Sequence, residues 1–167
     1  MSRRATAPVI AMVETPASAP QYELRVTSRG PLDPEFEIWQ VPAPATPHIR
    51  SPVRIAGLHG RNLELVEHRV LKRLARAGIR VDSRPLAGEQ RFRITEHLAL
   101  TLGLLFRVLA PMRSRENMRQ VAEGVEAMNP EEAAYWLGMA MHRKNPRRVL
   151  TALRVLLTEP RRPGVVH

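Results

Sequence analysis

The chain contains no cysteine, few aromatic residues and no hydrophobic run long enough for a membrane. Without cysteine, disulfide bonds and thiolate metal sites are excluded. The longest apolar run, Leu98 to Leu105, is interrupted by Thr101 and is much shorter than the roughly 20 residues that span a bilayer. With two Trp, two Tyr and three Phe, the core should be mostly aliphatic. We therefore expect no membrane partner. The N-terminal residues 2–13 imitate a signal peptide, but their apolar run of about seven residues contains Pro8 and is marginal for one, so we expect a cytoplasmic location.

Residues suited to catalysis are also scarce. The chain has two aspartates, Asp33 and Asp82, and its six histidines are scattered. No phosphate-binding loop, dinucleotide-binding glycine fingerprint or nucleophile elbow occurs, and Gly57 to Gly60 is interpreted as a turn. We therefore predict no catalytic residue, no metal and no cofactor.

A small metal-dependent enzyme is one alternative. Glu64 and His68 are four residues apart on a predicted helix, so they could share a metal ion, with His97 beside Glu96 as a further ligand. The spacing typical of metalloproteases is absent. This alternative predicts bound metal.

The first third of the chain is rich in proline, with nine of the 15 prolines before residue 53. Residues 1–20 show no apolar period and predict a disordered leader. Tyr22 to Val26 and Phe36 to Val41 alternate apolar and polar residues around a turn, which predicts a β-hairpin. We therefore divide the chain into a leader (1–20), a hairpin with a proline-rich linker (21–55), a helical domain (56–160) and a flexible tail (161–167).

Five helices are predicted from apolar residues at helical spacing. The first runs from about residue 61 to 77 and ends at Gly78, a typical C-terminal glycine. The second, capped by Thr95 and ending before Pro111, is apolar nearly all round, so it should be the central, buried helix. Residues 81–93 between them are interpreted as a loop.

The last three helices begin near Ser114, at Asn129-Pro130 and at Asn145-Pro146. Asn is a good N-cap, and Pro fits the first helical turn because its missing N–H would have no partner there. The residues predicted to face inward are Met118, Val121, Ala122, Val125, Met128, Ala133, Leu137, Ala140, Met141, Val149, Leu150, Leu153, Leu156 and Leu157. The predicted fold is therefore mainly α, a compact bundle of about five helices with a small N-terminal β-hairpin packed against them.

The net charge is +10, and 24 of the 26 basic residues are arginine. This balance suits a nucleic-acid partner or an anionic protein, although it is also what a GC-rich genome produces. The cations gather in two places, on one face of the first helix and around the fourth and fifth. The candidate nucleic-acid-binding residues are Arg69, Lys72, Arg73, Arg76, Arg80, Arg143, Lys144, Arg147, Arg148 and Arg154.

The fourth and fifth helices, with a turn of about three residues between them, have the sequence layout of a helix-turn-helix. In such a unit the second helix presents its N-terminal side chains, here Arg147 and Arg148, to DNA. Tightly joined helices also occur in any small bundle. Tyr135 and Trp136 are candidate partner-binding residues, although a Trp among apolar neighbours is more often part of a core.

Four blocks of the chain resemble an uncharacterised bacterial helical domain family of unknown function over residues 58–158. The blocks are Leu102 to Arg113, Ala122 to Met128, Glu131 to Trp136 and Arg147 to Arg154. The resemblance implies a small helical domain, with a role as an accessory subunit in DNA processing or phage defence. It offers no catalytic residues.

The first functional hypothesis is a non-enzymatic accessory protein that binds DNA, RNA or a larger protein subunit that processes nucleic acid. Its Arg-rich helix faces would carry that binding. The alternative is a protein–protein interaction module, or a homodimer, that does not bind nucleic acid.

Overall fold

The computed structural model describes residues 20–28, 34–42, 51–59, 67–81 and 88–159. The elements of these residues are, in chain order, β1 (Gln21–Ser28), β2 (Pro34–Val41), β3 (Val53–His59), α2 (Glu67–Arg76), β4 (Gly88–Ile94), α3 (Glu96–Leu109), α4 (Arg115–Glu126), α5 (Pro130–His142) and α6 (Pro146–Thr158). Each helix among these elements is too short or too polar to span a lipid bilayer.

A four-stranded antiparallel sheet forms one side of the molecule, with the strand order β3-β2-β1-β4. The predicted hairpin is its centre: β1 pairs with β2, and Leu24 lies opposite Ile38. The prediction of a mainly helical bundle with a small hairpin is therefore wrong, because two further strands extend the hairpin on both edges. The fold is α+β.

The strand β3 was interpreted as linker and turn because a β-bulge interrupts its alternation. Ile38 pairs with Ala56 and Trp39 pairs with Arg54, so Ile55 is an extra residue without a partner on β2. The bulge turns both Ile55 and Ala56 into the core. Two adjacent inward residues do not match the period of two on which strand prediction depends.

The strand β4 was interpreted as a loop because most of its residues are polar. It is an edge strand, paired only with β1 among the described strands. Its inward positions are Gln90, Phe92 and Ile94, and Glu89 and Arg91 alternate with them. An edge strand that buries so little carries a weak apolar signal.

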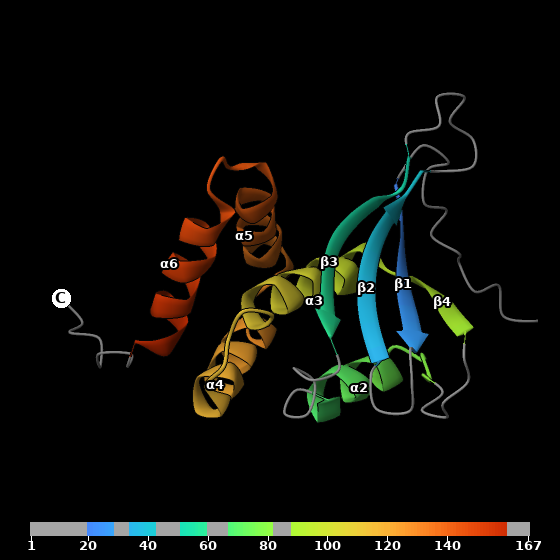
Figure 1. The fold of residues 1–167 in the computed structure, drawn as a ribbon, viewed down its shortest axis with the longest axis horizontal. Helices are drawn as coiled ribbons and strands as arrows, with labels where there is room; N and C mark the ends of the chain where they lie inside the picture. Colours follow the sequence, from blue (N-terminus) through green and yellow to red (C-terminus); the bar gives the residue numbers. More distant parts are fainter. Residues whose placement is uncertain (1–19, 29–33, 43–50, 60–66, 82–87, 160–167) are drawn as a thin grey trace, which may run out of the picture.

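The helix α3 connects the two halves of the fold, as its apolar circumference predicted. It packs against the sheet on one side and against α4, α5 and α6 on the other (Figure 1). Ten of its residues are buried, including Leu102, Leu104 and Phe106. One continuous core runs from the sheet through α3 into the C-terminal helices.

The helix ends follow the predicted signals. Thr95, Asn129 and Asn145 are N-caps whose side chains each accept a hydrogen bond from a backbone N–H in the first turn. Ser114 is also an N-cap, but its side chain makes no such bond. Of the residues predicted to face inward, Leu156 is the clear exception, with 58% of its surface exposed.

The helix α2 ends where Gly78 predicted. Gly78 has a φ of 80°, the Ile79 N–H bonds the Leu74 carbonyl at 2.9 Å, and the Gly78 N–H bonds the Ala75 carbonyl at 3.0 Å. These two bonds form a Schellman motif, which ends the helix and fixes the direction of the chain after it. Val70 and Leu74 are buried and attach α2 to the core.

Candidate nucleic-acid interface

The basic face of α2 lines a hollow in the molecular surface. The hollow has a volume of about 550 Å³, and its described lining residues are Arg69, Lys72, Arg73, Arg76 and Glu126. The helical period places these cations side by side, because Val70 and Leu74 turn the opposite face of α2 into the core. The hollow thus gathers four cations around one carboxylate.

The four cations differ in how they are held. A guanidinium nitrogen of Arg69 bonds Glu123 of α4 at 2.5 Å, and another lies 3.6 Å from Glu126. Among the described residues, Lys72, Arg73 and Arg76 have no ion-pair partner. Arg69 therefore fastens α2 to α4, and the other three cations are available to an anionic ligand.

Arg80 was predicted to extend this basic face. It lies beyond the end of α2 and is exposed, but it is not among the described residues that line the hollow. The Schellman turn at Gly78 redirects the chain before Arg80, so the helical spacing that connected it to Arg76 in the sequence no longer applies.

The second predicted cluster lies at the junction of α5 and α6. Arg143, Lys144, Arg147 and Arg148 are all exposed there. Among the described residues none of them has an ion-pair partner. They form a solvated basic turn rather than a hollow.

Arg154 does not belong to this basic turn, although the sequence grouped it there. Its Nε donates a hydrogen bond of 3.0 Å to the backbone carbonyl of Val108, in the last turn of α3. Partial burial lowers the pKa of its guanidinium from the ordinary value. Arg154 therefore fastens α6 to α3 by satisfying a carbonyl near the helix end.

The two basic clusters lie far apart. In Figure 1 the junction of α5 and α6 lies at the upper left of the molecule, and α2 lies below the lower end of the sheet. They do not merge into one stripe. A ligand that touched both would have to reach across the molecule, so each cluster is considered separately.

The predicted two-helix unit is present, since α5 and α6 are separated by residues 143–145. The outward face of α6 after Arg148 is largely apolar, however, with Val155 49% and Leu156 58% exposed. Base recognition needs polar side chains on this face of the second helix. The composition of α6 therefore argues against its insertion into a DNA groove.

The aromatic pair on α5 is divided between surface and core. Tyr135 is 59% exposed, whereas Trp136 is half-buried and packs against the core. Their rings meet edge to face with centroids 5.6 Å apart. Tyr135 is thus the member of the pair that a partner can reach.

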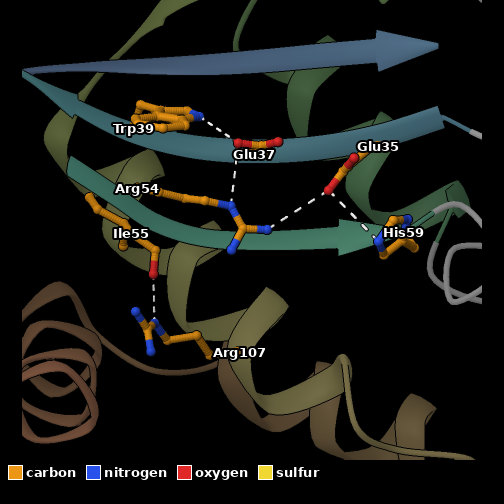
Figure 2. Close-up of polar contacts among 7 residues, drawn as sticks. All are labelled: Glu35, Glu37, Trp39, Arg54, Ile55, His59 and Arg107. Carbon is orange, nitrogen blue, oxygen red and sulfur yellow. Dashed lines mark hydrogen bonds and ion pairs between the residues drawn. The ribbon is translucent and has the colours of Figure 1, made fainter. Parts of the chain in front are cut away.

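The face of the sheet turned away from α3 carries a polar network that the sequence did not predict (Figure 2). Trp39 Nε1 donates a hydrogen bond of 2.7 Å to Glu37, and Arg54 Nε donates one of 3.3 Å to the same carboxylate oxygen. Arg54 also lies 3.9 Å from Glu35, which lies 3.7 Å from His59. Cations and carboxylates alternate here, so this face is not a second site for anions.

The side chain of Arg25 stacks on Trp39 at the same face, with its guanidinium carbon 4.4 Å from the ring centroid. It also forms an ion pair of 3.3 Å with Glu23. The alternation of the predicted hairpin places its polar residues on this face. Arg54 belongs to β3, which the sequence did not predict, so its position on the same face follows only from the structure.

The alternative metal site finds no support in the described residues. Glu64 and the side chain of His68 lie outside them, and Glu96 and His97 are exposed. Within the described ranges, no three His, Asp or Glu side chains are grouped closely enough to hold a metal ion.

The comparisons with known proteins extend the predicted resemblance toward the N-terminus. Searches among curated proteins and among solved structures found no match. A family profile described as "Domain of unknown function (DUF7680)" matches residues 22–159, which include β1 from its second residue, the other three described strands and all the described helices. The sheet and the helices are therefore parts of one family domain, and the prediction of a family of unknown function is confirmed. The chain belongs to the family "Domain of unknown function (DUF7680)".

Proposed function

We propose that this protein binds the phosphate backbone of nucleic acid through the α2 hollow. The observation that carries the proposal is the set of three cations, Lys72, Arg73 and Arg76, that line one hollow without ion-pair partners among the described residues. Arg69 forms ion pairs with two carboxylates of α4. These pairs hold α2, the helix that carries the three cations, against α4. The net charge of +10 would draw a polyanion toward the surface over a longer range.

The side chains that line the hollow are better suited to contact the phosphate backbone of a nucleic acid than to recognise a base sequence. Arg73 and Arg76 offer the planar forks of donors that suit phosphate oxygens. Glu126 is the one described acceptor side chain in the lining, so few groups could read the edges of bases. Binding is therefore expected to be independent of sequence and strongly dependent on salt.

The test is the binding of fluorescent single-stranded and duplex DNA, measured by anisotropy over a series of salt concentrations. Three available cations predict a slope of log K against log salt of about −3 for duplex, since each phosphate contact contributes about −0.9. The variant R73M/R76M removes two phosphate contacts, so the slope should become less steep by the contribution of two contacts. Binding to every sequence should weaken alike.

The matched control is R143M/R147M, which removes the same charge at the exposed α5–α6 junction. It should retain most of the affinity, because the α5–α6 junction lies far from α2. Circular dichroism and urea unfolding check that both variants are folded. The absence of binding at low salt, or an equal loss in both variants, would overturn the proposal; equal loss would mean attraction by net charge alone.

A further inference from the structure

The outward face of α6 forms a continuous stripe along the whole helix. Its members recur at the spacing of one helical face and are Arg148, Thr151, Ala152, Val155 and Leu156, and Glu159 follows at the same spacing as the C-cap residue. All of them are exposed. The core-facing side of α6 is separate and contains Leu150 and Leu153. An apolar centre is thus bounded by a cation at one end and a carboxylate at the other.

The position of α6 leaves this stripe open. The helix packs against α3, α4 and α5 and lies at the outer edge of the molecule, with no described element on its outer side (Figure 1). Neither Arg148 nor Glu159 has an ion-pair partner among the described residues. Val155 and Leu156 are exposed side by side, and an apolar patch rimmed by polar residues is typical of an interaction surface.

The stripe is complementary to itself when two copies run antiparallel. Ala152 then lies opposite Val155 of the second copy, and Thr151 lies opposite its Leu156. The same register brings Arg148 opposite Glu159 of the second copy, and two-fold symmetry repeats each contact. No other register pairs both charges while it aligns the apolar centre. Such reciprocal pairing is the property that a two-fold interface requires.

We propose that a second copy of this chain covers α6, so that the protein is a homodimer joined by an antiparallel α6–α6 contact. The positions Arg148, Ala152, Val155 and Glu159 have the spacing of a helical seam in which side chains of two helices interlock. One helix face buries less than the ~800 Å² per partner of a standard interface. We therefore expect a weak, reversible dimer.

Sedimentation equilibrium of the full chain, after nuclease treatment and at high salt, measures this association without nucleic acid. High salt screens the repulsion between two chains of charge +10. The expected result is a reversible monomer–dimer equilibrium. Since DNA is absent, failure here leaves the α2 proposal untouched, and loss of DNA binding leaves this one untouched.

The variant L156E should raise the dissociation constant at least tenfold, because it removes an apolar side chain from the contact and buries a charge there without a partner opposite it. L156E also lowers the net positive charge of each chain, which by itself should reduce the repulsion between two copies and favour the dimer. Loss of the dimer would therefore come from the changed α6 contact and not from net charge. The matched control is Y135E, which makes the same charge change at an exposed aromatic residue of α5 and should leave the dimer intact. Both positions are exposed, so urea unfolding should be nearly unchanged.

A charge swap tests the register. R148E alone and E159R alone each place like charges opposite one another at both ends and should weaken the dimer, by about tenfold at moderate salt. The double variant R148E/E159R restores opposite charges and should recover the wild-type dissociation constant. A monomer at every concentration, a dimer indifferent to L156E, or a double variant no stronger than the singles would overturn the proposal.

Discussion

Arg107 of α3 donates a hydrogen bond of 2.6 Å from its Nε to the backbone carbonyl oxygen of Ile55 (Figure 2). Ile55 is the extra residue of the bulge in β3, so β2 has no partner residue for it. Burial, and then the nearby charge of Arg54, lower the pKa of the Arg107 guanidinium from its ordinary value. The bond therefore joins the central helix to the one irregular position of the sheet, at the cost of holding a charge partly out of water.

Replacement of Arg107 by Met should destabilise the fold, because the carbonyl of Ile55 loses its donor inside the protein. An unsatisfied buried acceptor costs about 1–3 kcal/mol, and relief of the partly buried charge offsets a part of this. We expect the free energy of unfolding to fall by about 1–2 kcal/mol. Urea unfolding followed by circular dichroism measures it.

The matched control for this substitution is R113M, because Arg113 is exposed in the connection before α4. The same chemical change should alter the free energy of unfolding there by less than about 0.5 kcal/mol. If R107M were no more destabilising than R113M, the bond to Ile55 would contribute nothing to stability.

The helical part of the fold could be predicted from sequence because its signals are local. Caps such as Asn129 and Asn145 act within one turn, and the apolar circumference of α3 reports its burial directly. The two missed strands depend on distant residues. The carbonyl of the bulged residue Ile55 accepts its hydrogen bond from Arg107, 52 residues away, and β4 is a strand because β1 offers it an edge.

The candidate binding residues likewise divide into features that local sequence predicts and features that depend on distant residues. The sequence located the α2 cations, since helical spacing alone places Arg69, Lys72 and Arg76 on one face. It could not separate the available cations from those already engaged. Arg69 is bound by Glu123 of α4, 54 residues away, and Arg154 by the carbonyl of Val108, 46 residues away. A charge pattern cannot reveal partners that only the tertiary fold brings near.

The caps of α5 and α6 provide a second stability prediction. The Asn129 side chain accepts a bond of 2.8 Å from the Glu132 N–H, and Asn145 accepts one of 3.3 Å from the Arg148 N–H. Substitution of either by Ala should lower the free energy of unfolding by about 1 kcal/mol, with the larger loss at the shorter bond. Chemical unfolding of both variants checks this.

Asn117 supplies the control for the cap variants. It is exposed within α4, where Ala is the better helix former, so N117A should leave the free energy of unfolding unchanged or raise it slightly. An equal loss in N117A and N129A would show that the asparagines act through something other than capping.

The third prediction concerns stability at alkaline pH and rests on Tyr22. Burial, and then the charge of Glu96 and a hydrogen bond with that carboxylate, raise the pKa of the Tyr22 hydroxyl above its ordinary value of 10.0. The native state therefore holds this proton at pH values where the unfolded chain has lost it. The resulting stability is fully present below pH 10 and is lost as the pH rises through the native pKa.

The chain has two tyrosines, so the variant Y135F leaves Tyr22 as the one phenol that ultraviolet absorbance reports. Its ionisation in the native state should have a midpoint above 10, and in denaturant the midpoint should return to about 10. The free energy of unfolding of Y135F should fall above pH 10 more steeply than that of Y22F/Y135F, by at most about 1.4 kcal/mol for each pH unit. Because the double variant keeps every other titrating group, parallel pH profiles for the two proteins would contradict a raised pKa at Tyr22.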